Sequence, residues 1–204
     1  MAAEYLYIVK RTYLDTKNPG QLEVNVVLPA TFTDLKAAKN EARNILTWEG
    51  YETEFFSVYD VKDGTKEWKH GDGVVVYAEG PSGERLKVEI DTVPNSLRLQ
   101  VNDTERVQTP LYHVLQTVIE YDTDRSGAQR SSFVQGSFTS LAQAQDQALH
   151  VLLGADVTKE DFVEYNEYLD GTEGPFGPDV LVHAVKEGGQ NVIVSVISER
   201  SMEK

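Results

Sequence analysis

The sequence predicts an α+β protein built from two similar units, each an antiparallel sheet with helical segments on one face. Three observations support this class: residue matches at a constant spacing, one amphipathic segment in each unit, and a closing pair of strands joined through glycines. Of the 204 residues, 40% are hydrophobic and 25% are charged, which is typical of a globular chain. Because there is no cysteine, disulfides, thiol nucleophiles and cysteine-ligated metal centres are excluded.

An internal repeat is the most informative feature of the chain. Residues 31–35 (TFTDL) resemble residues 137–141 (SFTSL), which places Phe32 and Phe138 106 positions apart. The same spacing relates a set of core-type and turn-type residues: Ala38, Ala42, Leu46, Phe56, Tyr59, Gly71, Val74, Val76, Ala78, Gly83 and Val88. Nearer the start, residues 15–20 resemble residues 122–127 at a spacing of 107. The sequence therefore predicts a tandem duplication, with one unit over 1–93, a second over 110–198 and a tail over 199–204.

Each unit is expected to have the order β-β-α-(α)-β-β. A strand rich in aromatic and β-branched residues is predicted over 5–14, and a second over 22–28. Apolar residues at helical spacing predict a helix over 34–46, with Thr33 as N-cap and Thr139 as its counterpart. Residues 54–61 and their counterpart 160–168 fit either a strand or a helix, and the spacing of Phe56 and Tyr59 favours a short helix.

Two strands joined by a glycine-containing turn close each unit. They are predicted over 74–79 and 85–91 in the first unit, and over 180–185 and 191–197 in the second. Residues 94–109 between the units form either a linker or an added edge strand.

The two faces of the closing hairpin differ between the units. The face expected to pack on the helix carries Val74, Val76, Ala78, Leu86, Val88 and Ile90. In the first unit the opposite face carries Val75, Tyr77, Lys87 and Glu89. In the second it carries Leu181, Val185, Ile193 and Ile197, too many apolar side chains to leave in water. The two antiparallel sheets are therefore expected to pack on each other as an intramolecular pseudo-dimer, and an interface with a second chain would serve equally well.

A ligand pocket is one hypothesis for the region where two such sheets meet. Tyr77 corresponds to His183 at the 106 spacing, and Tyr7 corresponds to His113. These four residues are the candidate ligand-binding set, and His113 and His183 are the candidate catalytic residues if the protein is an enzyme, since histidine exchanges protons near neutral pH. The alternative is that all four are amphipathic residues at a sheet interface with satisfied hydrogen bonds.

Three other motifs have a structural and a functional interpretation. Residues 122–127 match the first half of a calcium loop, but Arg130 and Phe133 stand where the second half needs ligands, which favours a hairpin turn. The loop over 68–73 places Trp68 and His70 among glycines, as binding loops often do. Residues 156–173 hold seven acids and one lysine, which favours the wet side of a helix over a cation site or a surface for a basic partner.

Charge and motif content narrow the classes of function. A formal net charge of −14 argues against nucleic-acid binding, since phosphates need clustered Lys and Arg. No secretion signal or membrane-length apolar run is present, which with the missing cysteines favours a cytoplasmic protein. The four histidines lack zinc-ligand spacing, and phosphate-loop, dinucleotide and nucleophile-elbow motifs are missing, so we expect no cofactor and no metal.

Residues 67–73 (EWKHGDG) and 110–117 (PLYHVLQT) resemble segments of uncharacterised proteins of filamentous fungi. The resemblance covers nearly the whole chain and implies neither an activity nor any site residue.

The sequence favours a protein that acts by binding a protein partner or a small molecule, with no catalytic chemistry and with homo-oligomerisation left open. The alternative is a small-molecule-binding protein or enzyme that uses a His/Tyr-lined pocket between the sheets. A third hypothesis is an acidic protein that binds cations.

Overall fold

The computed structural model describes residues 3–18, 25–169 and 174–199. The chain forms two compact units, which are described separately. The described part of unit 1 runs to Pro110 and includes Glu199, and unit 2 contains the described residues of 111–198. Several predictions lie outside the described residues: the turn at 19–20, the strand start at 22–24, the acids Asp170 and Glu173, and the tail residues 200–204.

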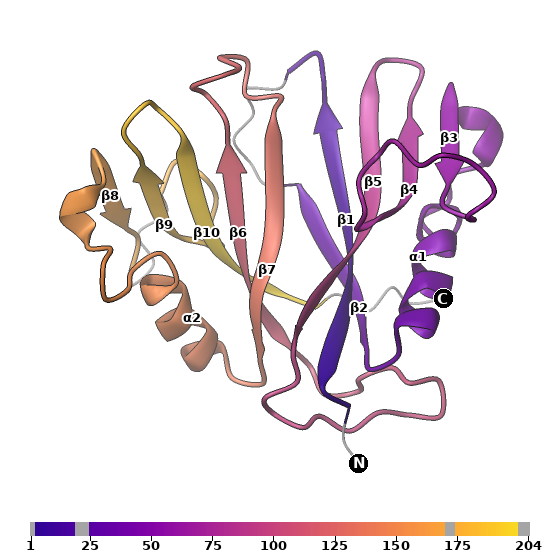
Figure 1. The fold of residues 1–204 in the computed structure, drawn as a ribbon, viewed down its shortest axis with the longest axis horizontal. Coiled ribbons are helices and arrows are strands. Elements are labelled where there is room, and N and C mark those ends of the chain that lie inside the picture. The colour runs from indigo at the N-terminus through magenta and orange to yellow at the C-terminus, as the bar shows by residue number, and fades with distance from the viewer. Residues whose placement is uncertain (1–2, 19–24, 170–173, 200–204) are drawn as a thin grey trace. The chain divides into compact units, whose positions relative to one another are not determined.

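Unit 1 contains a five-stranded antiparallel sheet in the order β2-β1-β5-β4-β3 (Figure 1). Its strands are β1 (Tyr5–Asp15), β2 (Val26–Phe32), β3 (Val58–Val61), β4 (Val74–Glu79) and β5 (Glu84–Pro94). β1 and β5 pair along their full lengths, from Tyr5 opposite Pro94 to Asp15 opposite Glu84. This long central pair supports the flanking strands.

Unit 2 contains a second antiparallel sheet with the same pattern of neighbours, β7-β6-β10-β9-β8. Its strands are β6 (Tyr112–Ile119), β7 (Arg130–Phe138), β8 (Glu164–Glu167), β9 (Val180–Val185) and β10 (Asn191–Ser198). Two such sheets, each with one α-helix, confirm the α+β class. Face-to-face packing of the two sheets stays a prediction from the sequence.

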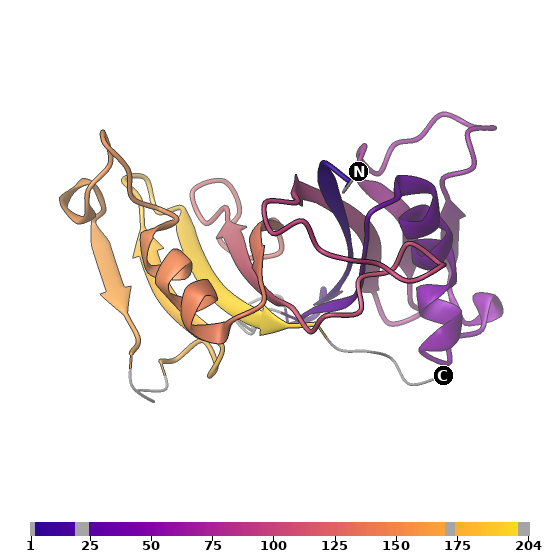
Figure 2. The same cartoon turned by 90° about the horizontal axis from the view of Figure 1, so that it is seen from below.

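Helix α1 (Leu35–Trp48) packs on one face of the unit 1 sheet (Figure 2). It begins at Asp34, whose extended backbone lets a side-chain oxygen accept a hydrogen bond from the Ala37 amide at 2.7 Å. Its C-cap is Glu49, and the next residue, Gly50, has a φ of 91° that favours glycine and an amide that donates to Thr47 O. In unit 2, α2 (Leu141–His150) has Ser140 as N-cap. The predicted caps, Thr33 and Thr139, are therefore wrong by one residue.

The Asp34 cap supports a first prediction. Asp34→Ala should lower the free energy of unfolding by about 1 kcal/mol, because the Ala37 amide loses its acceptor. Ser140→Ala is the matched control, since the Ser140 side chain makes no capping hydrogen bond. Urea unfolding of both variants measures the difference, and equal losses would contradict the role given to Asp34.

Residues 54–61 do not form the favoured helix. A single 3₁₀ turn, η1 (Thr53–Phe55), is followed by β3, and in unit 2 η2 (Lys159–Asp161) is followed by β8. Phe56 lies at the junction of the two elements, and its ring centroid is 5.5 Å from that of Tyr59. The junction brings this pair together, so a spacing of three residues did not require a helix.

The core of unit 1 lies between α1 and the sheet. Ala38, Ala42, Ile45 and Leu46 of the helix pack against a strand set that includes Val76, Ala78, Leu86 and Val88. Val75 joins this core in place of the predicted Val74, because the register of β4 against β5 shifts between Val74 and Val76. In unit 2 the register of β10 against β9 shifts in a similar way between Val194 and Ser195, and Leu181 of β9 lies in the core. Bulges of this kind change which face a side chain occupies.

Part of the segment over 94–109 lies along β2. Pro94 is the last residue of β5, and isolated bridges follow: Arg106 bridges to Phe32, and Val101 bridges to Val107. The Val107 amide donates to Thr31 O at 2.9 Å, and the Thr33 amide donates to Glu105 O at 3.0 Å. These bonds satisfy outer backbone groups of β2, but the described residues 95–109 form no regular edge strand.

Within the described ranges, neither helix has the length and apolar character that crossing a bilayer requires.

Candidate functional site

The predicted correspondence between Tyr7 and His113 is wrong by one residue. Tyr7 lies opposite Phe32, whereas Tyr112 lies opposite Phe138, the repeat partner of Phe32. Tyr112 therefore occupies the position of Tyr7. Tyr7 packs against the helix-side core of unit 1, whereas His113 is fully buried with Nδ1 2.9 Å from Ser137 Oγ.

Tyr77 and His183 do occupy matching positions in their sheets. Tyr77 lies opposite Asp60 of β3, and His183 lies opposite Asn166 of β8. Each packs against a ring from the loop that precedes its strand: Tyr77 stacks on His70 at 4.0 Å between centroids, and the His183 ring centroid lies 4.3 Å from that of Phe176. The matched positions thus hold a loop to the outer hairpin in each unit.

The four predicted residues are not all brought together within their own units. Tyr7 belongs to the helix-side core, whereas Tyr77 lies between two residues of that core and faces away from it. His113 and His183 lie opposite Ile197 and Ile193 of β10, four residues apart, which is roughly 13 Å along an antiparallel strand. His183 Nε2 lies 2.7 Å from Asn191 Oδ1. A pocket between the units that uses these residues stays a prediction.

The loop over 68–73 forms an aromatic cluster with Tyr77. Trp68 packs edge-on to His70 at 4.9 Å and donates from Nε1 to Gly71 O, while His70 Nε2 lies 2.8 Å from Asp60 Oδ2. The Tyr77 hydroxyl donates to Glu79. These contacts hold the loop on β3 and β4.

The Tyr77 hydroxyl carries a second prediction. Burial, together with the hydrogen bond to Glu79, raises the pKa of Tyr77 to about 12. Because this value lies above the ordinary 10.0, the folded state favours the protonated phenol, and this stabilisation is lost as the pH rises from 10 towards 12. Glu79→Gln should lower the pKa, as followed by tyrosinate absorbance in an alkaline titration. Tyr77→Phe assigns the transition, and an unchanged pKa in Glu79→Gln would contradict the role of Glu79.

The acidic motifs of unit 2 are engaged in local contacts. Asp124 accepts from the Ser126 hydroxyl and amide and from the Gln129 amide, and the Ser126 hydroxyl is the main cause that lowers the pKa of Asp124. Lys159 pairs with Glu167 at 2.7 Å. In the part of the chain that the structure describes, His, Asp and Glu side chains form no group of three or more able to hold a metal ion.

A polar cavity of about 460 Å³ lies in unit 1, beside the segment that bridges to β2. Its lining residues come from one loop and from the chain segment after β10: Asn102, Thr104, Arg106, Val107, Gln108, Thr109, Pro110 and Glu199. The volume is within the range of small-molecule sites. None of the four histidines belongs to this lining.

A short reversal of the chain fixes the loop that lines the cavity. Val101 bridges to Val107, and the Asn102 amide donates to Arg106 O at 3.1 Å. Asn102 Oδ1 accepts from the amides of Thr104 and Arg106, each at 3.0 Å, and from the Thr104 hydroxyl at 2.7 Å. Glu105 adopts φ of 60° within the turn. Side-chain acceptors of this kind stabilise tight turns.

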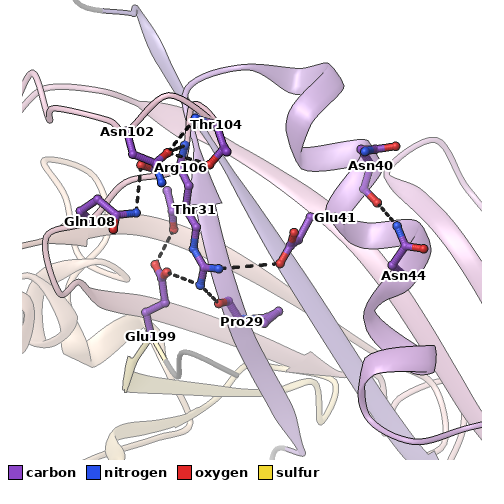
Figure 3. Close-up of polar contacts among 10 residues, drawn as sticks. All are labelled: Pro29, Thr31, Asn40, Glu41, Asn44, Asn102, Thr104, Arg106, Gln108 and Glu199. Carbon is purple, nitrogen blue, oxygen red and sulfur yellow. Dashed lines mark hydrogen bonds and ion pairs between the residues drawn. The ribbon is translucent and has the colours of Figure 1, made fainter. Parts of the chain in front are cut away.

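Arg106 links the cavity to β2 and α1 (Figure 3). Its Nη2 donates to Pro29 O at 2.9 Å and lies 4.0 Å from Glu199 Oε1, while Nη1 lies 3.9 Å from Glu41 Oε1. The Thr31 hydroxyl donates to Glu199 Oε2 at 2.8 Å. The guanidinium therefore lies between two carboxylates, and its charge is compensated inside the protein.

These cavity residues were missed in the sequence because residues 94–109 lie outside both copies of the repeat. One usable signal for a chain reversal is present in the sequence: two valines, Val101 and Val107, flank a turn that begins with Asn102 and Asp103. Nothing in the sequence pattern indicates that Glu199 reaches Arg106.

Comparisons with protein-family models, curated proteins and solved structures find no match to this chain.

Proposed function

We propose that this protein binds a small molecule without catalysing its conversion, and that the cavity beside Arg106 is its binding site. The observation that carries the proposal is the lining of the cavity, which combines amide and hydroxyl side chains with an arginine whose guanidinium is already compensated by Glu41 and Glu199. Such a lining offers hydrogen bonds for recognition.

The placement of the acid–base groups supports a non-catalytic role. Each histidine has a ring nitrogen engaged by a neighbour: His70 by Asp60, His113 by Ser137, His150 by Asp146 O, and His183 by Asn191. The carboxylate in the cavity, Glu199, is likewise held by Thr31 and by Arg106. A general base must reach the proton that it removes, and these groups are directed at structural partners.

Duplication of one ancestral unit is part of the same proposal. It is supported by the common strand order of the two sheets and by a helix that follows the second strand of each. It is also supported by the register shift in the closing pair of each sheet. A protein partner, homo-oligomerisation, a cytoplasmic location and the fungal resemblance stay predictions from the sequence.

A ligand screen tests the proposed function. Neutral sugars and polyols, amino acids, nucleotides and organic acids are added singly to the full-length protein, and the melting temperature is recorded. We expect at least one class to raise the melting temperature. Gln108→Leu should weaken the binding of that ligand by roughly two- to tenfold, because a hydrogen-bonding group of the lining is lost.

Gln145→Leu is the matched control, since Gln145 is an exposed residue of α2 in unit 2. Equal weakening in both variants, or no hit in any class, would overturn the proposal. Recovery of the ligand unchanged after long incubation is the expected result, and turnover would overturn the non-catalytic part.

A further inference from the structure

The chemistry of the cavity indicates which class of molecule it takes. Resting on the proposed function, we infer that the ligand is an uncharged, hydroxyl-rich molecule of the size of a mono- or disaccharide. Three observations support this class: the compensated charge of Arg106, the engaged carboxylate of Glu199, and the hydrogen-bonding groups and apolar surface of the lining.

The first observation concerns anions. An anionic ligand gains most from a cation whose charge is unbalanced, but Arg106 already has Glu41 and Glu199 within 4.0 Å and donates to Pro29 O at 2.9 Å. An anion would approach these same carboxylates and would lose hydration on entering. Charge therefore selects against phosphorylated and carboxylated molecules.

The second observation concerns cations. Glu199 is the one carboxylate among the described residues of the lining, and its side chain is only 9% exposed. Its two oxygens face Thr31 Oγ1 at 2.8 Å and Arg106 Nη2 at 4.0 Å. A cationic ligand would have to compete with the guanidinium, so a neutral molecule meets the smallest electrostatic cost.

The third observation concerns hydrogen bonding and shape. Asn102, Thr104, Gln108 and Thr109 line the cavity with amide and hydroxyl groups, which suit the alcohol groups of a ligand. Asn102 Oδ1 already accepts three hydrogen bonds within the loop, so this residue offers the ligand its amide nitrogen as a donor. Pro110 supplies apolar surface, which suits the C–H face of a sugar ring. The described residues of the lining include no aromatic ring on which a nucleobase could stack.

The loop is also held in place before a ligand arrives. The three hydrogen bonds to Asn102 Oδ1 and the edge pairing of Arg106 with Phe32 fix the backbone that carries most of the lining. A preformed site loses less conformational entropy on binding. Uncharged ligands depend on this saving in entropy because they lack charge–charge attraction to the protein.

The test uses four probes that share one ring and differ in charge: glucose, glucosamine, glucuronate and glucose 6-phosphate. Isothermal titration of the full-length protein should show the lowest Kd for glucose, with the anionic probes weaker by about tenfold or more. Gln108→Leu should raise the Kd for glucose, and Gln145→Leu should leave it unchanged.

Glu199→Gln provides a second readout. The variant keeps an acceptor for the Thr31 hydroxyl but removes one of the two carboxylates beside Arg106, so glucuronate should bind more tightly relative to glucose than in the wild type. Tighter binding of a charged probe by the wild type, sensitive to Gln108→Leu, would overturn the ligand class and leave the proposed function standing. Failure of all four probes would also overturn the class, and only an empty screen of the wider panel would overturn the function itself.

Discussion

Lys10→Ala should lower the free energy of unfolding by about 3–5 kcal/mol. The Lys10 side chain is only 2% exposed, and its Nζ lies 2.9 Å from Asp91 Oδ1 and 3.6 Å from Glu89 Oε2. Removing the ammonium leaves two carboxylates close together in a partly buried place, where their repulsion is poorly screened. Urea unfolding at neutral pH measures the loss.

Unit 2 suggests the control for this experiment. At the matching strand positions it carries Leu115 opposite Ser195, with Ile197 two residues further along β10. A triple variant with Lys10→Leu, Glu89→Ser and Asp91→Ile should therefore recover at least half of the loss, because an apolar set can replace a buried ion pair. A triple variant as unstable as Lys10→Ala would show that the ionic groups have a role beyond mutual compensation.

Phe32→Ala should cost about 3–5 kcal/mol of unfolding free energy. Phe32 is 4% exposed, belongs to the core under α1, and its backbone also bridges to Arg106 at the edge of the sheet. Loss of the ring creates a cavity beneath the strand to which the loop over 101–107 is attached. Thermal and urea unfolding measure the effect.

Phe55→Ala is the matched control for Phe32→Ala, since the same type of side chain is removed but Phe55 is 48% exposed. Its cost should stay below about 1 kcal/mol, because little apolar surface leaves the core. If the two variants lost equal stability, the assignment of the core to the α1 side of the sheet would be wrong.

Strands with strong alternation could be predicted closely. The ranges expected for β4 and β9 match the structure residue for residue, and α1 differs from its expected range by one residue at its start and two at its end. The predictions failed where two neighbouring residues satisfied the same local rule, as at the N-cap of α1. Thr33 and Asp34 are both good N-cap residues, and only the backbone shows that Asp34 is extended and accepts from Ala37.

Long-range contacts limited what could be predicted of the site. The correspondence between Tyr77 and His183 followed from the repeat, because both strands kept their register. That between Tyr7 and His113 failed, because a shift of one residue moves a side chain to the other face of a sheet. The cavity depends on contacts such as that of Glu199 with Thr31, 168 residues apart, which no local pattern encodes.

The return of the chain to unit 1 at Glu199 has a consequence for biosynthesis. Every other described residue of the cavity lining has been synthesised by Pro110, but the carboxylate that Thr31 and Arg106 hold is added only after the whole of unit 2. At translation rates of about 5–20 residues per second, this delay amounts to roughly 5–20 seconds. The nascent chain therefore has the loop, its guanidinium and Glu41 before the second carboxylate arrives, so the binding site is completed only after unit 2 has been made.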